Sequence, residues 1–175
     1  IGGVHRGGSG DISADLPELQ RTPVAVVCSG AKAILDLPRT NEWLETAGVP
    51  VLGWQTDSFP AFFTRSTSLP VQARVEDAAE AASILDMHWN LGGAGALITV
   101  PCPEETALGE DEIEGALALA EKEAHDSGIR GKDVTPYLLS RLAELSEGRT
   151  LQANLALLRR NAFTAAKIAG ALSEL

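Results

Sequence analysis

The sequence contains few cysteines, few aromatic residues and no long hydrophobic run. Only two cysteines, Cys28 and Cys102, occur in 175 residues. Each lies in or beside a predicted strand, so we expect reduced, buried thiols and no disulfide framework. The apolar runs stay far below the roughly 20 residues of a membrane-spanning helix. These absences exclude a disulfide-stapled scaffold and a spanning helix, and they favour a cytoplasmic protein.

Positive charge is also scarce. The chain has 14 lysines and arginines against 24 aspartates and glutamates, which gives a formal net charge of −10. Such a chain does not bind nucleic acid or an anionic membrane through a basic surface. A phosphorylated small molecule remains a suitable ligand, because a few local donors outweigh a diffuse acidic field. We therefore expect a small-molecule partner, and neither nucleic acid nor a membrane.

Short apolar runs alternate with amphipathic segments along the chain. The run 24–28 has the length and β-branched content of a buried strand, and similar runs follow at 49–54 and 94–100. Helical patterns occupy 41–47, 76–91, 110–127, 137–146 and 151–172, and the expected N-caps include Asp15, Thr40 and Thr150. Strands that alternate with helices predict one α/β domain with a mainly parallel sheet covered on both faces.

A lysine follows the first predicted strand almost at once. Ser29 and Gly30 end the apolar run, and Lys32 comes next, where a helix or turn is predicted up to Pro38. Open α/β folds place their chemistry just beyond the carboxyl ends of parallel strands. An amine that forms an imine must be neutral part of the time, which desolvation beside an apolar strand favours. The alternative is a surface lysine on a short helix.

Other polar residues precede this lysine. Segment 11–15 has the sequence Asp-Ile-Ser-Ala-Asp, which suits either a divalent-cation site or an Asp/Ser cluster that caps a helix. Segment 2–7 has the sequence Gly-Gly-Val-His-Arg-Gly. Its glycines let backbone amides approach an anion, and Arg6 can hold a phosphate by two hydrogen bonds. A lone histidine such as His5 is more often structural.

Together these segments resemble the pseudouridine-5'-phosphate glycosidases, also called indigoidine-synthase-A-like proteins. The resembling stretches keep the family's order and run through 2–7 (GGVHRG), 11–16 (DISADL), 26–36 (VVCSGAKAILD), 45–50 (ETAGVP), 59–63 (FPAFF), 131–139 (GKDVTPYLL) and 151–154 (LQAN). The resemblance implies a three-layer α/β/α sandwich that assembles into a homotrimer. It also implies cleavage of the C-glycosidic bond of pseudouridine 5'-phosphate, which yields uracil and ribose 5-phosphate.

The resemblance also assigns roles to residues of this chain. It implies that Lys32 is the nucleophile that bonds to C1 of ring-opened ribose 5-phosphate. It implies that Asp11 anchors Mn²⁺, or another divalent cation such as Mg²⁺. The residues implied to line the substrate site are His5, Ser13, Ala14, Asp15 and Asn154.

The chain departs from the family in three respects. We expect residues 1–175 to be the C-terminal portion of one such domain, because the family's general acid, a glutamate, lies in an N-terminal half absent here. Segment 7–10 is shorter than its usual family counterpart, either because the loop is shortened here or because residues are missing from the sequence. Val100 stands where the family commonly has an asparagine. If that asparagine contacts the base, Val100 contacts the aglycone here, and an apolar residue there suits a C-glycosynthase that joins ribose 5-phosphate to an aromatic acceptor. A non-catalytic fragment or assembly subunit is a second alternative.

Overall fold

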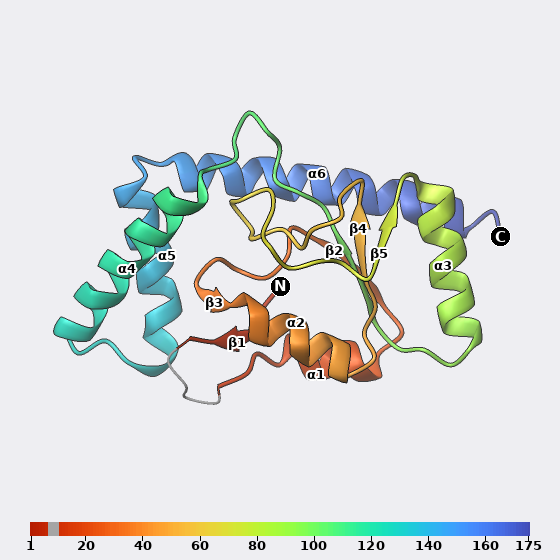
Figure 1. Ribbon diagram of the computed structural model, residues 1–175, viewed down its shortest axis with the longest axis horizontal. Coiled ribbons are helices and arrows are strands. Elements are labelled where there is room, and N and C mark those ends of the chain that lie inside the picture. Colours follow the sequence, from red (N-terminus) through yellow and green to blue (C-terminus); the bar gives the residue numbers. More distant parts are fainter. Residues whose placement is uncertain (7–10) are drawn as a thin grey trace.

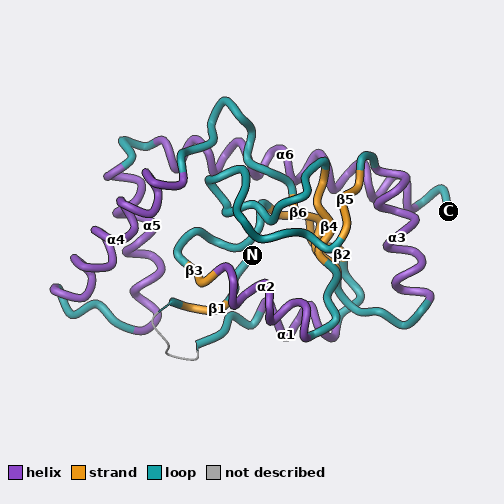
Figure 2. The backbone as a smooth tube through the Cα atoms, viewed as in Figure 1, coloured by secondary structure: helices purple, strands orange, loops and turns teal. Residues whose placement is uncertain are grey.

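The computed structural model describes residues 1–6 and 11–175, so segment 7–10, with the question of its length, lies outside the described residues. Its centre is a parallel sheet in the order β2-β6-β4-β5 (Figures 1 and 2). The strands are β2 (Ala25–Cys28), β4 (Val51–Trp54), β5 (Ala73–Val75) and β6 (Ala96–Thr99). The three apolar runs therefore form strands as predicted, and β5 is an addition. A separate antiparallel pair joins β1 (Val4–His5) to β3 (Leu35–Asp36).

Six α-helices surround the sheet in the described part of the chain. They are α1 (Asp15–Arg21), α2 (Leu37–Thr46), α3 (Ala78–Asn90), α4 (Glu110–Asp126), α5 (Val134–Leu145) and α6 (Arg149–Leu172). Figure 1 shows α6 along one side of the molecule, α1 and α2 on the opposite side, and the α4–α5 pair at one end. No described helix is both long enough and apolar enough to cross a membrane.

Alternating strand residues divide the core into two layers. Val26, Cys28 and Leu97 pack in one cluster with Leu16 of α1 and Leu44 of α2. Their strand neighbours face the other way and form a second cluster with α3 and α6, which includes Val27, Ile98, Leu85 and Ile168. Because strand side chains alternate between faces, helices cover both sides of the sheet. The predicted α/β/α sandwich is confirmed.

Three predicted helix caps are wrong, because each of these residues lies inside its helix, one or more positions after the observed N-cap. Helix α2 begins at Leu37, with Asp36 as its N-cap and Pro38 inside its first turn, which tolerates proline. Thr40 lies within α2, where its hydroxyl accepts the Val4 N–H at 2.9 Å. Asp15 lies inside α1, after the N-cap Ala14. Thr150 lies in the first turn of α6, where its hydroxyl meets Ser146 Oγ at 3.0 Å.

Both cysteines and the aromatic loop belong to the core. Cys28 and Cys102 are free and buried, and burial raises the pKa of each thiol. The expected place of both thiols in the core is confirmed, and a raised pKa makes both poor nucleophiles. Phe59 is fully buried and Phe63 is 3% exposed, so this loop serves the core and leaves little apolar surface for an interface.

Candidate active site

Strand β1 brings the three N-terminal motifs together. On one side, Val4 and His5 pair with Asp36 and Leu35 of β3. On the other side, Val4 forms an isolated bridge with Ile12, and the His5 N–H donates to the Asp11 carbonyl at 3.0 Å. The DISAD segment and the lysine segment therefore flank the same short strand.

Two glycines allow this close approach. The Gly2 N–H donates to Asp15 Oδ2 at 2.6 Å, and the Asp15 N–H donates to Ser13 Oγ at 3.3 Å. A Cβ atom at Gly2 would lie 2.1 Å from Ser13 Oγ and 3.0 Å from Asp15 Oδ2. A Cβ atom at Gly3 would lie 2.5 Å from Thr40 Oγ1. Only glycine fits at either position, because such separations are far below van der Waals contact. The Ser13 and Asp15 side chains are therefore held against the backbone of Gly2.

Lys32 lies in a turn just beyond β2 and is half-buried. Its N–H donates to the Ile1 carbonyl at 3.1 Å, and its own carbonyl accepts from the Leu35 N–H at 3.0 Å. Gly30 precedes it with a φ of 82°, which glycine adopts without strain. The expected location at the carboxyl end of a parallel strand is observed, and the alternative of a lysine on a short helix is wrong.

Arg6 binds protein groups in this structure. Its guanidinium donates to the carbonyls of Ala33 and Leu35 and makes two further hydrogen bonds to the Glu114 carboxylate of α4. These bonds hold the pKa of Glu114 below its ordinary value and raise that of Arg6. The interpretation of Arg6 as a phosphate clamp is therefore wrong for this conformation, because its donors already have partners.

The candidate metal ligand is a single carboxylate. Asp11 is exposed, and across residues 1–6 and 11–175 no group of three or more histidines, cysteines, aspartates or glutamates is arranged to hold a metal ion. A hard cation such as Mg²⁺ often binds one or two carboxylates and keeps several waters. The site therefore fits a largely hydrated ion and does not fit a cage of protein ligands.

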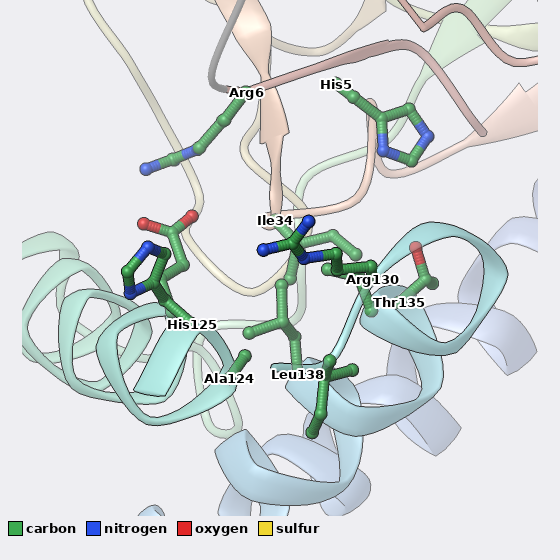
Figure 3. Close-up of a pocket in the computed structure, with 11 residues that line it drawn as sticks. His5, Arg6, Ile34, Ala124, His125, Arg130, Thr135 and Leu138 are labelled. Atoms are coloured by element: carbon green, nitrogen blue, oxygen red, sulfur yellow. The ribbon is translucent and has the colours of Figure 1, made fainter. Parts of the chain in front are cut away.

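Three of the five predicted substrate-binding residues line two different cavities, and Ser13 and Asn154 line neither of them. His5 lines a cavity of about 370 Å³ between β1, α4 and the start of α5, where Arg130 and Thr135 also lie (Figure 3). Ala14 and Asp15 line a second cavity of about 360 Å³ beside β2. Lys32 lines neither of the two. His5 therefore bonds to the DISAD segment through its backbone, but it lines a different cavity from Ala14 and Asp15.

Helix α6 makes a polar contact with Ser29, which lies between β2 and the lysine turn. Asn154 is half-buried and lies beyond the first turn of α6, while its neighbour Ala153 packs in one cluster with Ala33. Two turns further along, the side chain of Asn161 accepts a hydrogen bond from Ser29 Oγ at 3.2 Å, and both residues are buried. Our sequence analysis missed Asn161. Its helical spacing from the buried residues Ala153 and Leu157 is the signal that would have revealed it.

Val100 does not face a binding surface. It is fully buried and packs in the cluster of Leu52, Ile98 and Ile168, between the sheet and α6. Its N–H donates to the Cys28 carbonyl at 2.7 Å. The idea that its side chain contacts the aglycone is therefore not supported, because the side chain is part of the core.

We expect Val100→Asn to destabilise the protein and to bring no gain in catalysis. The substitution buries an amide without a partner and removes apolar contacts, which lowers the free energy of unfolding by about 2–4 kcal/mol. Urea titration checks this, with Leu91→Asn as the exposed control, since Leu91 is 83% exposed. A stable variant with faster uracil release would show that Val100 does contact the base.

The comparisons with known proteins agree with the motifs. A family model described as indigoidine synthase A like protein matches residues 1–171. The chain belongs to the indigoidine synthase A-like family. It is 56% identical to the pseudouridine-5'-phosphate glycosidase of Caldanaerobacter subterraneus, with all of this chain and 58% of that protein covered. It is 51% identical to the enzyme of the same name from Sorangium cellulosum, with all of this chain and 56% of that protein covered.

Solved structures of the family match equally well. The prealnumycin C-glycosynthase AlnA, in complex with ribulose 5-phosphate, superposes with a TM-score of 0.93 at 42% identity, covering 99% of this chain and 58% of AlnA. An indigoidine synthase A-like protein from Thermotoga maritima gives a TM-score of 0.87 at 39% identity, covering 99% of this chain and 56% of that one. The chain thus spans little more than half the length of the family members it matches.

Proposed function

We propose that the protein carrying this chain cleaves the C-glycosidic bond of pseudouridine 5'-phosphate, which yields uracil and ribose 5-phosphate. The observation that carries the proposal is the meeting of the Lys32 turn and the DISAD segment on the two sides of β1. The names of the two similar glycosidases support the reaction. The ribulose 5-phosphate bound to AlnA supports a pentose phosphate as the ligand class.

Lys32 is the proposed nucleophile. The amine Nζ bonds to C1 as the bond from C1 to the ring oxygen breaks, and that oxygen takes up a proton and becomes a hydroxyl. The bond from C1 to the base then breaks, its electron pair is protonated on the base carbon, and the nitrogen lone pair forms the imine with C1. Water hydrolyses the imine, which releases ribose 5-phosphate and regenerates the amine.

The residues proposed to contact the substrate are Ser13, Ala14, Asp15, Asn154 and His5. Of these, His5 lines a different cavity from Ala14 and Asp15. The family resemblance implies that the general acid, a glutamate, belongs to the part of the longer family chains that this chain does not match. We therefore propose that residues 1–175 form one portion of a larger domain.

Two further proposals concern assembly and location. A homotrimer is supported by apolar residues that α6 leaves exposed, namely Leu151, Leu155, Leu158 and Phe163. The remaining part of a longer chain is the other candidate to cover this face. Light scattering distinguishes a trimer from a monomer at micromolar concentration. Two free, buried thiols support a cytoplasmic location.

The AlnA likeness supports a second candidate function. AlnA is a C-glycosynthase, and its fold matches this chain with a TM-score of 0.93. The same lysine chemistry run in reverse would join ribose 5-phosphate to an aromatic acceptor. Incubation with pseudouridine 5'-phosphate, followed by uracil absorbance, tests the first function, and incubation of ribose 5-phosphate with an aromatic acceptor tests the second. The assay is run on residues 1–175 alone and on the full-length protein, which also tests whether this chain by itself is a non-catalytic subunit.

Asp11 is the proposed ligand for Mn²⁺ or Mg²⁺. A bound cation would supply positive charge beside the substrate oxygens. We expect a chelator to abolish uracil release and added Mn²⁺ to restore it. Asp11→Asn should weaken Mn²⁺ binding at least about tenfold with the fold intact, because an amide is a neutral and poorer ligand. The electron paramagnetic resonance signal of free Mn²⁺ measures this binding without reference to activity.

Asp111→Asn is the matched control for this experiment. Asp111 is an exposed aspartate in the first turn of α4, remote in sequence from the DISAD segment. Its substitution should leave Mn²⁺ binding unchanged. Full activity in the presence of chelator, or equal Mn²⁺ binding by both variants, would overturn the metal proposal.

A further inference from the structure

The Arg6 side chain donates hydrogen bonds to the backbone of the turn that carries Lys32. Arg6 Nη2 donates to the Ala33 carbonyl at 3.1 Å, and its Nε donates to the Leu35 carbonyl at 3.2 Å. His5 pairs with Leu35 across β1 and β3, so the Arg6 side chain bonds to the segment that pairs with the strand just before it. The two carbonyls belong to the residues directly after Lys32 and at the end of its turn.

Glu114 fixes the orientation of this guanidinium. Its two carboxylate oxygens accept from Arg6 Nη1 at 3.2 Å and from Nη2 at 2.9 Å. The Arg6 side chain is 31% exposed and that of Glu114 is 54% exposed, so solvent screens the charge–charge attraction. The Arg6–Glu114 pair therefore acts mainly through its geometry, because the planar guanidinium group joins α4 to the backbone of the lysine turn.

The rest of the turn is anchored on other sides. The Lys32 N–H donates to the Ile1 carbonyl, and the side chains of Ala33 and Ile34 are buried in two different core clusters. Arg6 is the contact that links these residues to a charged group on a distant helix. Without it, the carbonyls of Ala33 and Leu35 would lose donors, and the turn would be free to shift.

We propose that Arg6, oriented by Glu114, is a positioning residue that sets the location of Lys32 for attack on the sugar. This inference rests on the proposed function, because it presumes that Lys32 forms the imine. Arg6 acts through the backbone and not through the substrate, since its donors are already bonded to protein groups. A displacement of about 1 Å in a reacting group costs on the order of 100-fold in rate.

The test measures imine formation at Lys32 in the full-length protein. Ribose 5-phosphate is added at saturating and at low concentrations, the imine is trapped with borohydride, and the labelled lysine is followed by mass. We expect Arg6→Lys to slow labelling by about 10- to 100-fold at saturation, because an ammonium cannot serve two carbonyls and a carboxylate in one plane. The ribose 5-phosphate concentration for half-maximal rate should stay within about twofold, because Arg6 does not touch the sugar.

Three further variants separate positioning from general stability. Arg141→Lys is the matched control, because Arg141 makes the same kind of two-bond contact to Glu123 of α4 but lies on α5 and does not contact the lysine turn. It should label at the wild-type rate. Glu114→Gln should slow labelling only a few-fold, since Arg6 keeps its carbonyl bonds. Arg6→Ala should regain rate when guanidinium ion is added at concentrations too low to unfold the protein.

Three outcomes would contradict the positioning role of Arg6, and one of them would also contradict the proposed function. Wild-type protein that is not labelled would overturn the proposed function and this inference with it. Labelling of wild type and Arg6→Lys at equal rates would overturn the positioning role alone. A weaker apparent affinity for ribose 5-phosphate with an unchanged maximal rate would also overturn it, because that result would make Arg6 a direct phosphate ligand.

Discussion

Substitution of Lys32 should have the largest effect of any change in this chain. Lys32→Ala in the full-length protein should abolish uracil release from pseudouridine 5'-phosphate, a loss of at least about 1,000-fold, because the substitution removes the amine proposed to form the covalent bond. Borohydride trapping with ribose 5-phosphate should label wild-type protein at Lys32 and leave the variant unlabelled. Mass analysis of the peptide that contains residue 32 checks the site directly.

Lys32→Arg should be nearly as damaging, because a guanidinium stays protonated and does not form the imine. Lys122→Ala is the control, since Lys122 is an exposed lysine on α4, remote in sequence from the lysine turn. It should keep full activity and full labelling. Labelling that persists in Lys32→Ala would assign the nucleophile to another residue and remove the main support for the proposed chemistry.

The sequence predicted three of the sheet's four described strands, because their signal is local. Strands β2, β4 and β6 are apolar runs between two helical layers, and burial on both faces favours such runs. Strands β4 and β6 are central and buried at every position, whereas β2 lies at the edge of the sheet and is partly buried. Strand β5 has no such pattern, because two of its three residues are exposed and only Val75 is buried. Strands β1 and β3 have two residues each and exist through pairing across about 30 positions, which no local pattern shows.

The candidate site was predicted in part for the same reason. The position of Lys32 follows from the strand before it, so the apolar composition of residues 24–28 and their place in the sequence were enough to predict it. The role of Arg6 depends on Glu114, 108 positions away in the chain, and no spacing rule connects them. Thr40 has the side chain of a good N-cap, yet its hydroxyl binds the Val4 N–H of a different element. Local preference identified these polar residues, but tertiary contacts decided their partners.

Substitution of Gly2 should disable the substrate site without removing any functional side chain. In Gly2→Ala the new Cβ would lie 2.5 Å from Ser13 Cβ, an atom fixed to the backbone and unable to rotate away. Segment 11–15 must therefore move, and it carries the proposed metal and substrate ligands. We expect a loss in kcat/KM of about 100-fold, as for a displacement near 1 Å, and a fall of about 1–3 kcal/mol in the free energy of unfolding.

Gly115→Ala and Ser13→Gly separate crowding from other effects of the added methyl group. A Cβ at Gly115, an exposed residue of α4, meets nothing within 4 Å, so that variant should be neutral or more stable by about 0.5–1 kcal/mol. Ser13→Gly removes both Ser13 atoms that the new Cβ would strike. In the Gly2→Ala background it should therefore recover part of the lost stability, whereas kcat/KM should stay low because the proposed contact of Ser13 with substrate is gone. Losses that simply add in the double variant would show that Gly2 and Ser13 do not meet, and the arrangement of the DISAD segment around Gly2 would then be wrong.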